Sequence, residues 1–147
     1  MSVISHDENE TRALGRRLGQ ICQGGEIFAL SGELGSGKTK FAQGLAEGLK
    51  IQGRVNSPTF NIMKIYKVPG QGAIKVFCHI DAYRLNAKNN LATIGWGDFL
   101  GAENTVCAIE WAERIWQSLS SRKIKKINFK NISEQERQIK LYGIKHF

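Results

Sequence analysis

A glycine-rich octapeptide constrains the fold of this chain more than any other segment. The sequence GELGSGKT at residues 32–39 follows an apolar run at 27–30 and precedes residues 41–49, where apolar side chains recur at helical spacing. A strand, a glycine-rich turn and a helix in this order form the context of a phosphate-binding P-loop. Such a turn directs backbone N–H groups inward, and the helix adds the positive end of its dipole. The sequence therefore predicts a site for a nucleoside triphosphate.

Each position of this P-loop has an expected part in holding the nucleotide. A lysine at the position of Lys38 reaches the β- and γ-phosphates, and a hydroxyl at the position of Thr39 ligates Mg²⁺. We expect Lys38 to face solvent as a phosphate ligand rather than to join the core. The residues predicted to hold the triphosphate are Gly35, Ser36, Gly37, Lys38 and Thr39. The alternative, a glycine-rich turn with a chance Lys-Thr pair, does not account for the flanking strand and helix patterns.

Length and composition predict one globular domain over residues 1–147, with 41% hydrophobic and 23% charged residues. No segment is long and apolar enough to suggest a membrane span, and the N-terminal residues lack the pattern of a secretory signal. Cys22, Cys78 and Cys107 are odd in number and widely spaced, so we expect reduced, mostly buried thiols rather than a zinc site. These features favour a cytoplasmic location.

The rest of the pattern predicts an α/β fold: a P-loop NTPase-like central sheet, mostly parallel with an antiparallel hairpin, flanked by helices. Asp7 and Glu10 resemble a capping box before a helical pattern that reaches Cys22. Segments 61–68 and 73–81 are apolar and flank a Pro-Gly turn, which predicts the antiparallel hairpin. Later elements are expected as a strand ending at 110, a short helix at 112–119, and strands at 124–132 and 138–142.

Two carboxylates follow apolar runs at the ends of predicted strands. Asp81 closes the second strand of the hairpin, and Glu110 closes the run at 106–109. Since the carboxyl ends of parallel strands meet at one edge of a sheet, we expect both carboxylates near Thr39 and its Mg²⁺. The alternative is that one of them caps a turn or pairs with an arginine. For His79 we favour a hydrogen-bonded structural role over a catalytic one.

The net charge of +8 is concentrated near the C-terminus. Residues 122–147 contain eight lysines and arginines against Glu134 and Glu136, a net charge of +6. Such a surface suits RNA or an acidic partner. The alternative of a solvated, lysine-rich face is favoured, because no aromatic residues are interleaved for base stacking.

Four motifs together resemble the bacterial TsaE (YjeE) family. They are the P-loop at 32–39, Ser-Pro-Thr-Phe at 57–60, His-Ile-Asp-Ala-Tyr-Arg at 79–84, and Glu-Trp at 110–111. The resemblance runs through nearly the whole chain, and these motifs in this order are highly specific. It implies a small ATPase, weak on its own, that is required to make N6-threonylcarbamoyladenosine in tRNA. It also implies ATP and Mg²⁺ as cofactors, and the TsaD and TsaB proteins as partners.

The resemblance also assigns roles to single residues. Thr39, Glu110 and Asp81 match the residues at the metal and its water, with Lys38, Asp81 and Glu110 as the catalytic set. Residues 57–59 match a switch-like loop that senses the γ-phosphate, with Thr59 in the nucleotide-binding set, and Thr11 matches a residue near the adenine. Trp111 matches a tryptophan beside the site; if the strand ending at Glu110 continued through it, its side chain would point to the opposite face. The neutral to basic residues 86–90 depart from a family that often has acidic residues there.

Three other function classes are compatible with parts of the sequence. A small-molecule kinase of the P-loop class would need an acceptor pocket and an arginine-bearing lid, and no clear acceptor motif is present. A GTP-driven switch is disfavoured because the Asp-x-x-Gly match at 98–101 follows no apolar strand and no Asn-Lys-x-Asp motif occurs. A direct RNA-binding module, with weak tRNA contact through the basic C-terminal residues, does not exclude an ATPase.

Overall fold

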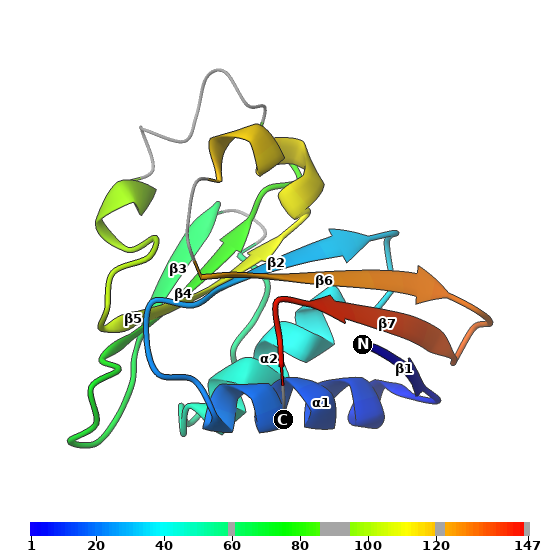
Figure 1. Ribbon diagram of the computed structural model, residues 1–147, viewed down its shortest axis with the longest axis horizontal. Coiled ribbons are helices and arrows are strands. Elements are labelled where there is room, and N and C mark those ends of the chain that lie inside the picture. The colour runs from blue at the N-terminus through cyan, green and yellow to red at the C-terminus, as the bar shows by residue number, and fades with distance from the viewer. Residues whose placement is uncertain (59–60, 86–94, 120–122, 146–147) are drawn as a thin grey trace.

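The computed structural model describes residues 1–58, 61–85, 95–119 and 123–145. Within those ranges it contains a seven-stranded mixed sheet with helices on its faces (Figure 1). The strands are β1 (Ser2–Ser5), β2 (Ile27–Gly32), β3 (Met63–Lys67), β4 (Val76–Asp81), β5 (Thr105–Glu110), β6 (Ile124–Asn131) and β7 (Arg137–Tyr142). The helices are α1 (Glu8–Gln20) and α2 (Lys38–Gly48), with the 3₁₀ segments η2 (Trp96–Asp98) and η3 (Ala112–Ser118).

The strand order is β1-β7-β6-β2-β5-β4-β3. The four central strands, β6, β2, β5 and β4, are mutually parallel, whereas β1, β7 and β3 join antiparallel at the two sides. Because the central strands run in one direction, β2, β4 and β5 end at the same edge of the sheet. The P-loop after β2, Asp81 at the end of β4 and Glu110 at the end of β5 are therefore brought to one place.

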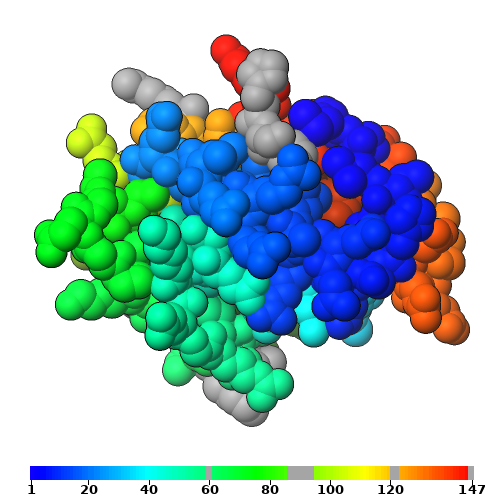
Figure 2. All heavy atoms as spheres, turned by 90° about the horizontal axis from the view of Figure 1, so that it is seen from below, coloured from blue at the N-terminus to red at the C-terminus, as the bar shows by residue number. Residues whose placement is uncertain are grey.

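Helices α1 and α2 cover one face of the sheet and lie side by side (Figures 1 and 2). Glycines let them approach closely, because a Cβ added at Gly15 would lie 2.2 Å from the carbonyl oxygen of Phe41. A Cβ at Gly44 would likewise lie 2.0 Å from the carbonyl oxygen of Arg12. Large residues at these positions would separate the two helices, and α2 carries the P-loop lysine and threonine in its first turn.

Two apolar clusters lie on the two faces of the sheet. The first packs α1 and α2 against the sheet, with Phe41 of α2 in contact with Phe28 of β2 and Phe129 of β6. The second lies under η2 and η3 and includes Ile80 and Ile109. The parallel centre of the sheet is thus covered on both faces, which explains the continuous apolar runs of β2 and β5. None of the helices in the described ranges has the length and apolar character needed to cross a bilayer.

The predicted α/β class and the antiparallel hairpin of β3 and β4 are confirmed. The Asp7 cap is confirmed as well, since its Oδ1 accepts a hydrogen bond from the Glu10 N–H at 2.8 Å. The sequence prediction missed β1, a four-residue edge strand whose pairing with β7 is visible only in the tertiary structure. Cys22, Cys78 and Cys107 are free thiols, as expected.

Candidate functional site

The P-loop connects the end of β2 to the start of α2 with a backbone that requires glycine. Gly35 and Gly37 have φ angles of +73° and +102°, in the left-handed region that L side chains rarely adopt. A Cβ at Gly37 would also lie 3.2 Å from both Arg137 Cδ and Thr11 Cγ2, so the chain packs tightly beneath the loop. Apart from its own chain neighbours, no described residue has an atom within 4 Å of a Cβ built at Gly35. The loop is thus supported from below at Gly37 and open at Gly35.

Lys38 is buried, with only 4% of its surface exposed, so the expectation of a solvent-facing lysine is wrong. Its Nζ donates hydrogen bonds to the carbonyl oxygens of Gly32 at 2.6 Å and Glu33 at 2.8 Å. The amine also lies 3.9 Å from the centroid of the Trp111 ring. Burial lowers the pKa of Lys38, although nearby carboxylates, Glu110 first among them, raise it. The lysine is folded back against its own loop, and a phosphate ligand would have to replace those carbonyl contacts.

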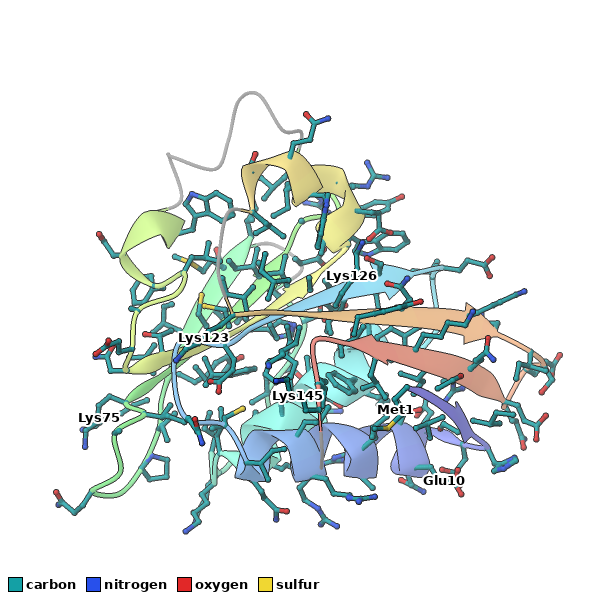
Figure 3. All side chains as sticks on the ribbon, in the orientation of Figure 1. Met1, Glu10, Lys75, Lys123, Lys126 and Lys145 are labelled. Carbon is teal, nitrogen blue, oxygen red and sulfur yellow. The ribbon has the colours of Figure 1, made fainter. Side chains whose placement is uncertain are left out.

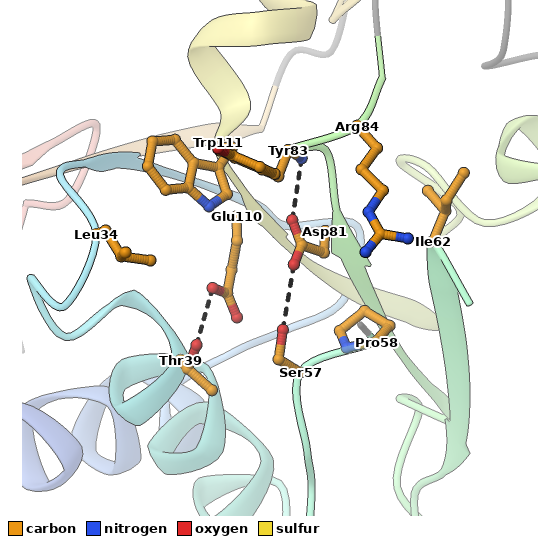
Figure 4. A pocket seen from close by; sticks show the side chains of 10 residues that line it. All are labelled: Leu34, Thr39, Ser57, Pro58, Ile62, Asp81, Tyr83, Arg84, Glu110 and Trp111. Atoms are coloured by element: carbon orange, nitrogen blue, oxygen red, sulfur yellow. Dashed lines mark hydrogen bonds between the residues drawn. The ribbon is translucent and has the colours of Figure 1, made fainter. Parts of the chain in front are cut away.

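Glu110 links β5 to two other elements of the site, α2 and β4. Its Oε2 accepts a hydrogen bond from the Thr39 hydroxyl at 2.9 Å, joining β5 to the first turn of α2 (Figure 4). Its Oε1 lies 2.8 Å from His79 Nε2. Glu110 is 3% exposed and His79 is fully buried. The structure therefore brings Glu110 and Thr39 together as the sequence predicted, and it adds His79 to them.

Asp81 lies next to Glu110 across the sheet, since the two are register partners of parallel strands. Its Oδ2 accepts from the Ser57 hydroxyl at 3.2 Å, and its Oδ1 accepts from the Tyr83 N–H at 3.0 Å (Figure 4). Asp81 thus does cap the turn after β4, the alternative considered from the sequence, while it also faces the site. Two neighbouring carboxylates and a hydroxyl are the oxygen ligands that Mg²⁺ prefers, so Thr39, Glu110 and Asp81 fit this ion.

Two cavities meet at these side chains. One, of about 170 Å³, is lined by residues 34–40 together with Glu8, Glu110 and Trp111. The other, of about 340 Å³, lies beyond Thr39 and Glu110 (Figure 4). The second is lined by Leu34, Thr39, Ser57, Pro58, Ile62, Asp81, Tyr83, Arg84, Glu110 and Trp111. Both cavities share Leu34, Thr39, Glu110 and Trp111, so Glu110 lies where the two spaces join, and Asp81 lines the larger one.

Trp111 points into the site (Figure 4); an opposite-face side chain was expected only if the strand continued through this residue, and it does not. The strand ends at Glu110, and Trp111 has φ 57° and ψ 38°, a left-handed conformation that turns the chain into η3. Its ring packs 5.0 Å from the ring of Tyr83, and the Arg114 guanidinium lies 4.7 Å from the Tyr83 ring centroid. A left-handed conformation in a bulky residue is uncommon and is often found at functional sites. Here it turns an aromatic wall toward Lys38.

The comparisons with known proteins agree with this geometry. Residues 5–139 match the family model "Threonylcarbamoyl adenosine biosynthesis protein TsaE". A Bacillus subtilis protein named "tRNA threonylcarbamoyladenosine biosynthesis protein TsaE" is 35% identical over 88% of this chain and 77% of its own length. A Streptomyces coelicolor protein of the same name is 38% identical over 78% of this chain and 75% of its own length. The chain belongs to the TsaE family.

A solved structure supports the same conclusion for the fold. The crystal structure of Bacillus subtilis YdiB superimposes with a TM-score of 0.74 at 29% identity, covering 95% of this chain and 82% of YdiB. The resemblance inferred from the four motifs is therefore confirmed. As a TsaE-family protein, this chain takes part in tRNA threonylcarbamoyladenosine biosynthesis.

Thr11 and Thr59 are the two predicted nucleotide-binding residues of this TsaE-family chain that lie outside the P-loop. Thr11 is fully buried, and its hydroxyl lies 2.7 Å from Ser5 Oγ and accepts from Arg137 Nη1 at 3.1 Å. It supports the P-loop from below at Gly37, and its role near an adenine stays a prediction. Thr59 lies outside the described residues, and so do residues 86–90, where the sequence departs from the family.

Sequence reasoning missed the support under the P-loop, whereas the hydrogen-bonded histidine expected at His79 is confirmed. Arg137 was counted with the basic C-terminal residues, yet it is 4% exposed and lies beneath Gly37. Its position in β7, 126 residues from Thr11, gives no local signal of that contact. For His79 a signal did exist, because its alternation with Asp81 along one strand places both side chains on the same face.

Proposed function

We propose that this TsaE-family chain binds ATP with Mg²⁺ and hydrolyses it slowly, as the nucleotide-dependent component of tRNA threonylcarbamoyladenosine formation. One observation carries the proposal: the Thr39 hydroxyl of the P-loop helix donates to Glu110 at 2.9 Å, at the joint between the two cavities. A P-loop threonine beside a strand-end carboxylate is the arrangement that holds a nucleotide-bound magnesium ion.

Each residue of the site has a role that follows from its chemistry. The P-loop amides and the Lys38 amine bind the β- and γ-phosphates, after Lys38 leaves the carbonyl oxygens of Gly32 and Glu33. Thr39 and Glu110 hold Mg²⁺, which neutralises charge that develops on the transferred phosphoryl group. Asp81, one strand away from Glu110, accepts a hydrogen bond from the attacking water or from a metal-bound water.

Adenine is the proposed base, because the sequence lacks the Asn-Lys-x-Asp motif that reads guanine. Competition between ATP and GTP for the purified protein tests this choice. We expect the protein to bind ATP more tightly than GTP. Equal or tighter binding of GTP would favour a GTP-driven switch instead.

The proposed partners are the TsaD and TsaB proteins, with a weak additional contact to tRNA through the basic C-terminal residues. The family assignment supports this, since the relatives named above are tRNA-modification proteins. A protein that works on tRNA with these partners is expected in the cytoplasm. Phosphate release from ATP, measured with and without TsaD and TsaB, is the decisive experiment. We expect a low rate alone and a higher rate with both partners.

A small-molecule kinase is the second candidate, and the cavity of about 340 Å³ beyond Thr39 favours it, because it offers space for an acceptor. Arg84 lines this cavity. Phosphate release from ATP without any added small acceptor would contradict the kinase. If phosphate appears only when a small acceptor is added, and on that acceptor, the ATPase proposal fails.

A further inference from the structure

His79 is a buried histidine with one satisfied and one unsatisfied nitrogen. Its side chain has no exposed surface, and that of Glu110 is 4% exposed. Its Nε2 lies 2.8 Å from Glu110 Oε1, and an ionised carboxylate can only accept, so Nε2 carries the hydrogen and donates. Its Nδ1 is buried and has no hydrogen-bond partner among the described residues. An apolar side chain would fill this place in the core without leaving an unsatisfied nitrogen, so packing alone does not explain a histidine here.

The bond from His79 completes a chain of contacts across three elements. His79 in β4 donates to one oxygen of Glu110 in β5, and Thr39 in α2 donates to the other oxygen. The carboxylate is therefore held at both ends. Because the Thr39 hydroxyl uses its hydrogen for Glu110, the lone pairs of its oxygen are left for a cation. The orientation of that hydroxyl depends on where Glu110 Oε2 is held.

We propose that His79 is a positioning residue for the magnesium site. Its N–H bond fixes the rotation of the Glu110 carboxylate, which in turn orients the Thr39 hydroxyl so that both groups present oxygen ligands together. Partners of metal-ligating groups that lie one contact behind the ligands commonly set metal affinity in this way. The inference rests on the proposed ATP- and Mg²⁺-binding function, and it assigns to His79 a part in metal affinity rather than in contact with the nucleotide.

Three variants separate positioning from packing. His79→Leu removes the donor and keeps a buried side chain of similar size. His79→Gln keeps a side-chain N–H donor that reaches about as far as Nε2. Phe77→Leu is the matched control, because its ring packs 6.2 Å from that of His79 on the same strand but has no N–H group to donate to Glu110. All three change the core of β4, and only His79→Leu removes the donor to the carboxylate.

The measurement is the Mg²⁺ dissociation constant of the protein saturated with a non-hydrolysable ATP analogue, by calorimetry. Metal-free analogue binding in EDTA and the melting temperature are measured for each variant. For His79→Leu we expect Mg²⁺ affinity to fall about tenfold, the lower end of the range for such partners, with metal-free binding unchanged. His79→Gln should recover most of that loss. Phe77→Leu should lower the melting temperature and leave Mg²⁺ affinity unchanged.

An independent check is to make His79→Leu in a protein that already carries Glu110→Gln. If His79 acts through Glu110, adding His79→Leu to Glu110→Gln should weaken Mg²⁺ binding no further. The proposal is overturned if His79→Leu lowers only the melting temperature, if Phe77→Leu weakens Mg²⁺ binding equally, or if the glutamine gives no recovery. Should the wild-type protein bind no ATP analogue at all, the proposed function itself fails, and this inference with it.

Discussion

The two halves of the central sheet differ in how their faces are covered. In the half formed by β2, β5 and β4, helices lie against both faces, and all six residues of β5 are buried. In the half formed by β6, β7 and β1, η3 reaches the face opposite α1 and α2 at β6, where Trp116 lies against Lys126, and within the described ranges no helix covers that face at β7 and β1 (Figure 1). Residues of β7 there alternate between buried and less buried positions. A strand buried on both faces can present charged groups only at its end, and the candidate site lies at such ends.

The open face of the second half is basic. Register pairing places Lys126 beside Tyr142, Asn128 beside Lys140 and Lys130 beside Gln138, all opposite the helix-facing cluster. None of the residues of β1, β6 and β7 is acidic. Figure 3 shows Lys126 on this side of β6 and Lys145 on the α1 side. The covered half thus has acids at its strand ends, of which Glu110 is buried, and the open half has lysines spread along its strands.

The largest expected effect on ATP affinity lies in the covered half, at Lys38. Lys38→Ala should lower ATP affinity about 100-fold, equivalent to about 2.7 kcal/mol, because the amine is the cation nearest the bound phosphates. The fold should survive, since burial already lowers the pKa of Lys38 and its removal relieves the cost of a buried charge. Calorimetric ATP binding and circular dichroism measure the two effects. Lys67→Ala, at an exposed position of β3, is the control. Unchanged ATP affinity in a folded Lys38→Ala protein would exclude the P-loop as the nucleotide site.

A large effect on catalysis is expected at Glu110. Glu110→Gln keeps the size of the side chain but removes a negative charge opposite Mg²⁺, so ATP hydrolysis should fall by about 100-fold or more. Binding of metal-free ATP should survive through the P-loop amides and Lys38. Phosphate-release assays over a range of Mg²⁺ concentrations, with Asp81→Asn in parallel, give the answer. Wild-type hydrolysis with an unchanged Mg²⁺ requirement would make Glu110 structural and leave Asp81 as the acid that holds the metal.

Two tryptophans, each in contact with a lysine amine, allow the two halves to be compared directly. Trp111 lies 3.9 Å from Lys38 Nζ in the covered half, and Trp116 lies 4.0 Å from Lys126 Nζ beside the open face. Trp111→Ala should weaken ATP binding by a few-fold, in line with about 1 kcal/mol for a partly desolvated cation–π contact. Trp116→Ala should leave ATP affinity unchanged. Equal effects of the two changes on ATP binding would show that the halves are not functionally distinct.

The smallest effect is expected on the open face. Replacing Lys126, Lys130 and Lys140 together by glutamine should weaken tRNA binding by a few-fold and reduce its salt dependence, with little change in basal ATPase. Lys125 is left out of this set, because its Nζ donates to the Gly143 carbonyl oxygen at 2.5 Å on the helix side of the sheet. The control replaces three lysines remote from this face, Lys64, Lys67 and Lys75. An unchanged salt slope would identify the open face as a solvated surface.

Sequence reasoning located the chemistry of the site better than its packing. The P-loop was predictable because the positive φ angles at Gly35 and Gly37 require glycine, a purely local constraint. Asp81 and Glu110 were predictable because an apolar run ending in a carboxylate marks a strand end in an α/β sheet. The burial of Lys38 was not, since it depends on the Trp111 ring and on carbonyl groups that turn back toward the amine. Nor was the left-handed turn at Trp111, which a bulky residue adopts only where its surroundings enforce it.

What the sequence determined by itself was the P-loop motif, the strand-end acids proposed for Mg²⁺ and the family, because each rests on short motifs. What only the tertiary structure decided was which groups touch. His79 and Glu110 are 31 residues apart, Thr39 and Glu110 are 71 apart, and Thr11 and Arg137 are 126 apart. The physical reason is that strand order and register fix such contacts, and both depend on the burial of whole faces rather than on any single segment.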